Sequence, residues 1–264
     1  QSLQMARVVR GVSSTAVGIP IIGKKFASER WPPVKVMQMN WLDLCFLHWP
    51  VRVATLRPFI PDALEVDTYD GWAWLALVPF TMTGVKPVGF PDIPRVSAFP
   101  EFNVRTYVRD RAVSGVWFFS LDCAHPLAVR VARTFFHLPY FDAQFERRWD
   151  RGWCHYWVRR THRGSPGVHF SGRFRPVGEV FRSQPGSLEE FLTERYWLFA
   201  QHPDGRVCRG RIFHQRWPLQ QAEVELDGHT MEAPLGLRLS GSPASLLFSA
   251  RIKATAQLLE PAEV

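Results

Sequence analysis

The residues best suited to chemistry lie on one predicted strand near the middle of the chain. Its alternating residues form two sets, Glu101, Asn103, Arg105 and Tyr107 on one side and Phe102, Val104, Thr106 and Val108 on the other. Successive side chains of a strand point to opposite faces, so one face carries four different hydrogen-bonding groups. Such a face is either a solvated surface or the wall of a polar cavity. In a cavity, Glu101 would serve as an acid–base group and Arg105 would bind a carboxylate.

Three further residues outside this strand are candidates for the same pocket. Glu194 and Arg195 fall in a predicted helix, where they form either an exposed salt-bridged turn or part of the pocket. His48 precedes a tryptophan and a proline, and it is either a buried structural histidine or a ligand-binding group. The residue types alone leave both readings open. Trp41, Trp72, Trp74 and Trp117 would supply apolar walls or ordinary core packing.

Mostly strands are expected to position these groups. Extended segments are predicted at Val36–Trp49 and Ser245–Leu259, and hairpins around Asp70-Gly71, residues 110–115, residues 163–167 and Asp227-Gly228. The strand Trp72–Phe80 is apolar on both faces and should lie centrally under a helix. Two helices are predicted, Pro126–Phe136 and one capped by Ser187 with Glu190. Antiparallel strands with a few inserted helices predict an α+β fold built on a barrel.

Length and composition are those of a globular protein. The 264 residues are 46% hydrophobic and show no linker, so residues 36–264 are expected to form a single domain. Residues 1–4 resemble a tag remnant, and residues 5–35 would be an N-terminal extension. We find no apolar run long enough for a transmembrane helix and no convincing signal peptide, which favours a cytoplasmic protein.

The sequence favours neither a metal nor a cofactor. Its four cysteines lie far apart with no Cys-x-x-Cys pair, so they are expected to be reduced, buried and not zinc ligands. No glycine-rich dinucleotide loop, phosphate loop or Gly-x-Ser-x-Gly elbow is found.

The positive charge raises one alternative function. The net charge is +8, and residues 130–182 hold eleven arginines interleaved with aromatic residues, a mixture suited to nucleic acid. Arginine, however, outnumbers lysine 27 to 5 in the whole chain, which indicates a compositional bias. No nucleic-acid-binding motif accompanies the charge, so this alternative is the less favoured one.

Several motifs resemble an uncharacterised bacterial family, the YqjF-like proteins. They include Asn40-Trp41, His48-Trp49-Pro50, Leu77-Val78-Pro79-Phe80, residues 99–108, residues 115–122, Leu138-Pro139-Tyr140, Thr193-Glu194-Arg195-Tyr196 and Trp217-Pro218-Leu219. The matches run through residues 36–260, nearly the whole chain. That family is in turn similar to acetoacetate decarboxylase. The resemblance implies a closed antiparallel β-barrel with flanking helices.

The resemblance to the decarboxylases supports the fold more than the reaction. Those enzymes carry Gly-Arg-Glu, a short gap and Gly-Tyr-Pro-Lys-Lys, where this chain has Ala132-Arg133-Thr134 and then residues 137–141, His-Leu-Pro-Tyr-Phe. Arg133 is retained, but Tyr140 and Phe141 replace both lysines, one of which forms the Schiff base in the decarboxylases. Schiff-base chemistry needs a neutral amine, which neither residue has. A lysine that had moved elsewhere, to Lys86 or Lys253, is the remaining route to it.

We therefore expect an internal cavity that binds a small organic acid or oxo-acid. The chain would be either an enzyme of lyase or hydrolase type or a non-catalytic binding protein. The expected acid–base and hydrogen-bonding residues are Glu101, Glu194 and Tyr140, and the expected ligand-binding residues are Asn103, Arg105, Tyr107, Arg133, Arg195 and His48. No metal, cofactor or membrane partner is expected, and the sequence leaves oligomerisation open.

Overall fold

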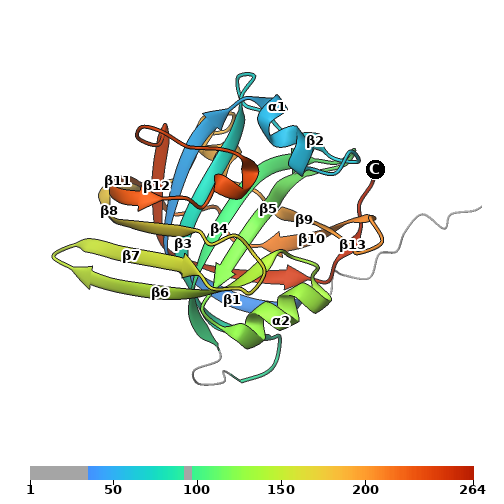
Figure 1. Ribbon diagram of the computed structural model, residues 1–264, viewed down its shortest axis with the longest axis horizontal. Helices are drawn as coiled ribbons and strands as arrows, with labels where there is room; N and C mark the ends of the chain where they lie inside the picture. The colour runs from blue at the N-terminus through green and yellow to red at the C-terminus, as the bar shows by residue number, and fades with distance from the viewer. Residues whose placement is uncertain (1–34, 92–96) are drawn as a thin grey trace, which may run out of the picture. The chain divides into compact units, whose positions relative to one another are not determined.

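The computed structural model describes residues 35–91 and 97–264 (Figure 1). Residues 34–264 form one compact unit. The sequence interpretations of a tag remnant at 1–4 and an extension at 5–35 lie outside the described residues, except for Lys35, which begins the first strand.

The chain is built mainly from strands. They are β1 (Lys35–Val51), β2 (Glu65–Val66), β3 (Ala73–Pro87), β4 (Ala98–Arg109), β5 (Ser114–Cys123), β6 (Tyr140–Asp150), β7 (Trp153–Arg160), β8 (His169–Phe181), β9 (Trp197–Gln201), β10 (Val207–Phe213), β11 (Leu219–His229), β12 (Ser245–Gln257) and β13 (Glu260–Pro261). The α-helices are α1 (Val53–Leu56), α2 (Pro126–Phe135) and α3 (Leu188–Thr193), and the 3-10 helices are η1 (Arg57–Phe59) and η2 (Ala233–Leu235). This content confirms the predicted α+β class with mainly antiparallel strands.

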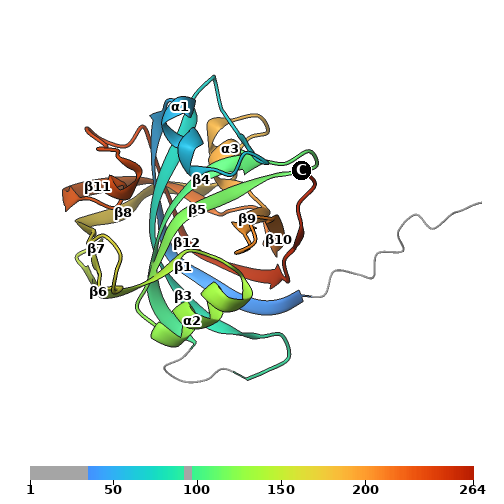
Figure 2. The same ribbon diagram turned by 45° about the vertical axis from the view of Figure 1, so that its right-hand side comes forward.

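All thirteen strands belong to one sheet that closes on itself twice. One ring of hydrogen-bonded strands runs β5-β6-β7-β8-β11-β12-β1-β3-β4 and returns to β5. A second ring runs β4-β5-β9-β10-β12-β1-β3, because β10 also pairs with β12. The two rings share five strands, β1, β3, β4, β5 and β12, which cross the middle of the molecule (Figure 2). Among the described strands, only the β5–β6 and β5–β9 pairs are parallel.

The shared strands are buried on both faces because each face belongs to a different core. Along β4, Phe102 and Val104 pack in the first ring with Tyr156 and Phe170, while Phe99 lies in the second. β3 is likewise buried from Ala73 to Met82, as its apolar sequence predicts. The first-ring core that contains its residues Ala73, Leu75 and Leu77 is formed by strand residues together with Leu56 of the short helix α1.

Three β-bulges keep apolar side chains turned toward the second ring. On β1, the side chains of Trp41 and then Leu44 face the second ring, one residue further apart than strict alternation gives. The β1–β3 register shifts at the same place, between Leu42 and Leu47. On β3 the bulge holds Gly84, whose φ of 60° suits a residue without a Cβ. On β5 the bulge lies between the partners of Val104 and Arg105. Each bulge inserts one residue and restores the inward direction after the strand bends.

The predicted helices are present with one correction. α2 starts at Pro126, and its N-cap His125 accepts a hydrogen bond from the Ala128 N–H at 3.2 Å. Ser187 caps α3 as predicted, accepting from the Glu190 N–H at 3.2 Å. The helix ends at Thr193, however, and Phe199 lies on β9. The spacing between Phe191 and Phe199 suits a helix as well as a strand. The segment that holds Phe199 is a strand because β9 pairs with β5 and β10.

The hairpin predictions are partly right. β4–β5 and β7–β8 are antiparallel neighbours as predicted. The Asp70-Gly71 turn forms with both φ values positive, but it closes only one bridge, Tyr69 to Trp72, and β2 pairs with β4 instead. At Asp227-Gly228 there is no turn, since β11 continues to His229 through a bulge. The Asp-Gly signal is the same at both places, so tertiary pairing decides the outcome.

Candidate functional site

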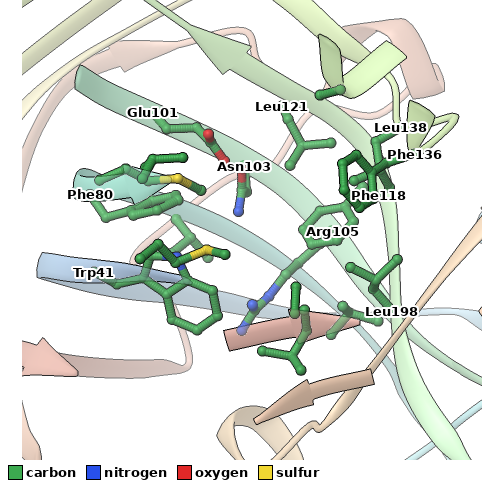
Figure 3. Close-up of a pocket in the computed structure, with 18 of the residues that line it drawn as sticks. Trp41, Phe80, Glu101, Asn103, Arg105, Phe118, Leu121, Phe136, Leu138 and Leu198 are labelled. Carbon is green, nitrogen blue, oxygen red and sulfur yellow. The ribbon is translucent and has the colours of Figure 1, made fainter. Parts of the chain in front are cut away.

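A cavity of about 200 Å³ lies within the second ring (Figure 3). Residues from all seven strands of that ring line it, and α2 contributes Ala128, Val131 and Ala132. The wall is largely apolar. Its apolar members include Met37, Met39, Trp41, Leu44, Val78, Phe80, Met82, Phe118, Leu121, Leu138 and Leu198. A closed strand ring with side chains that leave a space at the centre is a common setting for small ligands.

Glu101 is a fully buried carboxyl group in this wall. Its Oε2 accepts a hydrogen bond from the Tyr140 hydroxyl at 3.1 Å, while Oε1 has no hydrogen-bond partner. Burial raises the pKa of Glu101 to about 8, and the Tyr140 hydrogen bond opposes that rise. Burial also raises the pKa of the Tyr140 phenol well above its usual range. The raised pKa values favour the protonated form of both groups, in which each can donate a hydrogen bond.

Arg105 brings a positive charge to the same wall. Its Nε is buried without a hydrogen-bond partner, and its guanidinium lies 5.5 Å from the centre of the Phe46 ring. Within the described residues, no carboxylate lies close enough to form an ion pair with it. Most other buried or half-buried arginines are paired, such as Arg160 with Asp122 at 2.7 Å. Among the described residues, this guanidinium therefore stands beside the apolar cavity without a carboxylate partner.

Asn103 lies between Glu101 and Arg105 on the same face of β4 (Figure 3). It is buried, and its Oδ1 has no hydrogen-bond partner. Buried polar atoms normally have a partner, so an open one at a cavity wall is available to a ligand or water. One strand thus presents an acid, an amide and a cation to one space.

Two more polar residues line the cavity near Arg105. Arg195 is already engaged, because it donates to Asp67 Oδ2 at 2.7 Å and to the Phe191 carbonyl at 2.6 Å. His214 packs against Tyr196 and Trp217 with ring centres 4.6 and 5.0 Å apart. Burial lowers the pKa of His214, which favours the neutral ring. Within the part of the chain that the structure describes, Arg105 is therefore the cation in this part of the wall that pairs with no carboxylate.

Four of the residues predicted for the site lie outside the cavity wall. Tyr107 is buried below α3, where its hydroxyl donates to the Leu192 carbonyl at 2.8 Å and bonds His48 Nε2 at 2.8 Å. This places His48 in the structural role that the sequence left open. Burial and the Arg105 charge lower its pKa well below the usual range.

Glu194 and Arg133 both hold chain segments together. Glu194 Oε1 accepts from the Trp217 N–H at 3.0 Å, and Oε2 accepts from the Tyr196 hydroxyl. Arg133 is exposed on α2 and donates to the Tyr140 carbonyl at 2.8 Å. Neither side chain is among the residues that line the cavity. Helix spacing and the decarboxylase pattern do not reveal which way either side chain points.

Three wall residues were missed or undervalued by the sequence reading. Trp217 stacks on Trp41 with ring centres 5.7 Å apart, and the Nε1 atoms of both are buried without hydrogen-bond partners. Trp197 lines the cavity from β9, and His214 follows β10. Of the four tryptophans proposed as walls, only Trp41 belongs to the cavity; Trp72 is exposed, and Trp74 and Trp117 pack elsewhere. The Trp217-Pro218-Leu219 motif was the sequence signal from which Trp217 could have been predicted as a wall residue.

Four arginines of the segment 130–182 pair with carboxylates from other parts of the chain, among them Arg160 with Asp122. Arg173 pairs with Glu225 at 2.7 Å and Arg175 with Glu223. Arg147 pairs with Asp43. These carboxylates come from β1, β5 and β11, so counting charges within the segment overstated its positive field. No helix of the described chain is long and apolar enough to cross a membrane.

Residues 35–91 and 97–264 contain no candidate metal cluster and place no lysine in the cavity wall. No cluster of three His, Cys, Asp or Glu side chains there could hold a metal ion. Cys45, Cys123 and Cys154 are buried with free thiols, and burial raises the pKa of each. None of the described lysines lines the cavity. Lys253 is exposed on β12.

Comparison with known proteins identifies the family. The model of the DUF2071 family, described as an uncharacterized conserved protein, matches residues 38–253. The chain belongs to the DUF2071 family. It is 39% identical over 214 residues to the uncharacterized protein YqjF of Bacillus subtilis, covering 81% of this chain and 87% of YqjF. The predicted resemblance is confirmed.

Solved structures similar to this DUF2071 chain are acetoacetate decarboxylase-like. An acetoacetate decarboxylase-like enzyme from Sphingomonas wittichii superposes with a TM-score of 0.55 at 12% identity, covering 87% of this chain and 94% of its own. An acetoacetate decarboxylase superposes at 0.56, with 12% identity, 88% of this chain and 92% of its own. The enduracididine biosynthesis enzyme MppR, solved with pyruvate, gives 0.54 at 11% identity, with 89% and 92% covered. At these identities the likeness establishes the fold alone.

Proposed function

We propose that this DUF2071 protein binds a small organic acid in the cavity, with the carboxylate held by Arg105. The observation that carries the proposal is the guanidinium at the cavity wall with no carboxylate partner among the described residues. A planar guanidinium suits a carboxylate through two parallel hydrogen bonds. The binding of pyruvate by MppR, which shares the fold, supports an acid as the ligand class.

The cavity also has what an acid–base reaction requires. Glu101 has a pKa of about 8, so it exchanges its proton near neutral pH, and Tyr140 holds one of its oxygens. Groups with a pKa near the working pH are the most effective proton donors and acceptors. We therefore propose Glu101 as the acid–base group of a lyase or hydrolase type of reaction without an imine. The alternative is a binding protein in which Glu101 and Asn103 only orient the ligand.

The binding proposal is tested with a panel of small organic acids and isothermal titration calorimetry. The comparison is between wild type, Arg105→Met and Arg133→Met, where Arg133 is the exposed arginine outside the cavity. Charge-assisted hydrogen bonds contribute about 1.5–3 kcal/mol, so Arg105→Met should weaken binding about ten- to a hundred-fold. Arg133→Met should bind like wild type. Absence of binding by any acid, or equal losses in both variants, would contradict the proposal.

The catalytic reading is tested with whichever acid binds. The acid is incubated with wild type and with Glu101→Gln, and its consumption is followed by proton NMR. Turnover by wild type that is lost in Glu101→Gln while binding persists supports catalysis. An unchanged acid in the presence of bound wild type assigns the cavity to binding alone. Nucleic acid remains the less favoured alternative because the arginines of β7 and β8 are engaged by Glu223 and Glu225 or by aromatic rings.

A further inference from the structure

We infer that the acid bound in this cavity has an apolar body several carbons long, such as a medium-chain aliphatic or an arylalkanoic acid, rather than a short oxo-acid. The inference rests on the proposed function and adds the class of ligand. It follows from how polar and apolar groups are distributed along the cavity.

The charged groups gather at one end. The guanidinium groups of Arg105 and Arg195 lie 6.0 and 5.2 Å from the centre of the same Tyr107 ring. His214 and Trp41, whose ring centres are 6.0 Å apart, line the same cavity wall as Arg105. A carboxylate bound by Arg105 is therefore placed at this end of the wall.

The opposite end is mostly apolar and is lined in part by α2, to which the Glu101 partner Tyr140 is tied through Arg133. Phe99, at the start of β4, packs on His125, the N-cap of α2, with ring centres 5.6 Å apart. Ala128 and Ala132 of α2 line the cavity there. From Phe99 to Arg105 the strand advances six residues, about 20 Å at 3.4 Å per residue. The wall is thus much longer than a two- or three-carbon acid.

Between these ends the wall offers few polar atoms. On β4 they belong to Asn103 and Glu101, and Tyr140 of β6 adds the hydroxyl that bonds Glu101. Three methionines, Met37, Met39 and Met82, line the cavity from β1 and β3. Methionine side chains are unbranched and adapt to the shape of an apolar ligand. A short oxo-acid at Arg105 would leave this apolar wall without contacts, whereas an alkyl or aryl chain would cover it.

Chain length provides a direct test. We would measure Kd by calorimetry for straight-chain acids from butanoate to decanoate, for phenylbutanoate, and for pyruvate and acetoacetate. Each buried methylene should tighten binding about four-fold until the chain reaches α2. Acids of eight to ten carbons should then bind at least about a hundred-fold more tightly than pyruvate. A Kd that does not change with length, or tighter binding of pyruvate or acetoacetate, would overturn the inference.

Shortening the cavity from α2 provides the second test. Ala132→Leu adds bulk at the apolar end, and Leu127→Ala alters an exposed residue of the same helix. Ala132→Leu should weaken decanoate about ten-fold or more and leave butanoate unchanged, and unchanged butanoate also shows that the variant is folded. Leu127→Ala should match wild type for both acids. Equal effects of Ala132→Leu on both acids would mean that the alkyl chain of the acid does not extend to α2, and would overturn the inference.

The two proposals fail in different ways. If no carboxylic acid binds, the proposed function is wrong and the ligand class falls with it. If short acids bind through Arg105 and length brings no gain, the proposed function stands and the inference alone is wrong.

Discussion

The Tyr140 hydroxyl donates a hydrogen bond to the Glu101 carboxyl across the cavity wall, 3.1 Å from oxygen to oxygen. Tyr140 occupies one of the two positions where the resemblance places the lysines of acetoacetate decarboxylase. A phenol and a raised-pKa carboxyl therefore stand where an amine would be expected. The fold is similar, while neither of these two positions carries a lysine.

The first prediction concerns covalent chemistry. Incubation with acetoacetate and borohydride should leave the mass of the intact protein unchanged, because Tyr140 and Phe141 cannot form an imine. An authentic acetoacetate decarboxylase treated in parallel serves as the positive control. A stoichiometric mass increase that peptide mapping assigns to Lys86 or Lys253 would restore Schiff-base chemistry.

The second prediction is a pH dependence of stability. The Glu101 pKa is about 8 in the folded protein and 4.5 for an ordinary glutamate, so the folded state binds the extra proton between these values. Its contribution to the free energy of unfolding is thus greatest below pH 4.5 and falls as the pH rises toward 8. Glu101→Gln should remove this dependence, on the order of a few kcal/mol over the range. Urea unfolding at pH 5, 6.5 and 8 measures it, and parallel pH profiles for both proteins would contradict it.

The third prediction concerns the partner of Glu101. The hydrogen bond from Tyr140 lowers the Glu101 pKa, so Tyr140→Phe should raise that pKa further. Carboxyl carbon NMR titration of wild type and variant measures the change. Tyr69→Phe removes an exposed hydroxyl that bonds the Gly186 carbonyl and should leave the Glu101 titration unaltered. A Glu101 pKa that is unchanged or lower in Tyr140→Phe would show that the hydrogen bond does not act on the carboxyl.

The fourth prediction tests the closure of the second ring. A Cβ at Gly115 on β5 would collide with the Trp197 carbonyl and lie 2.9 Å from the Phe199 ring on β9. Gly115→Ala should therefore lower the free energy of unfolding by about 1–3 kcal/mol through overpacking. Gly167→Ala, where nothing lies within 4 Å of the added carbon, is the matched control and should change little. Equal stability of the two variants in urea would mean that β9 is not closely packed on β5.

How far the sequence predicts this protein depends on whether the signal is local. The alternation from Glu101 to Arg105 is local, and the structure places Glu101, Asn103 and Arg105 on one cavity wall. Tyr107 continues the alternation, yet it leaves the cavity because Leu192 and His48 engage its hydroxyl. The alternation predicts which side chains of a strand share a face. It does not predict how far the cavity extends along that face, because this depends on segments far away in the sequence.

The errors arise where partners come from elsewhere in the chain. Glu194 is held by the Trp217 N–H, 23 residues away, and Arg147 by Asp43, 104 residues away. Neither pairing leaves a trace in the neighbouring sequence. The second ring was also not predicted, since it depends on β10 pairing with β12 over two residue pairs. Trp217 and His214 therefore remained outside the predicted site.

The five strands shared by the two rings tie the cavity to the rest of the molecule. A shared strand that detached would expose Phe102 and Val104 in one core together with Glu101 and Asn103 in the other. The two halves should then unfold in a single cooperative transition. Ligand binding in the second ring would raise the temperature of that transition for both halves. The melting temperature of the whole chain therefore reports whether the cavity holds a ligand.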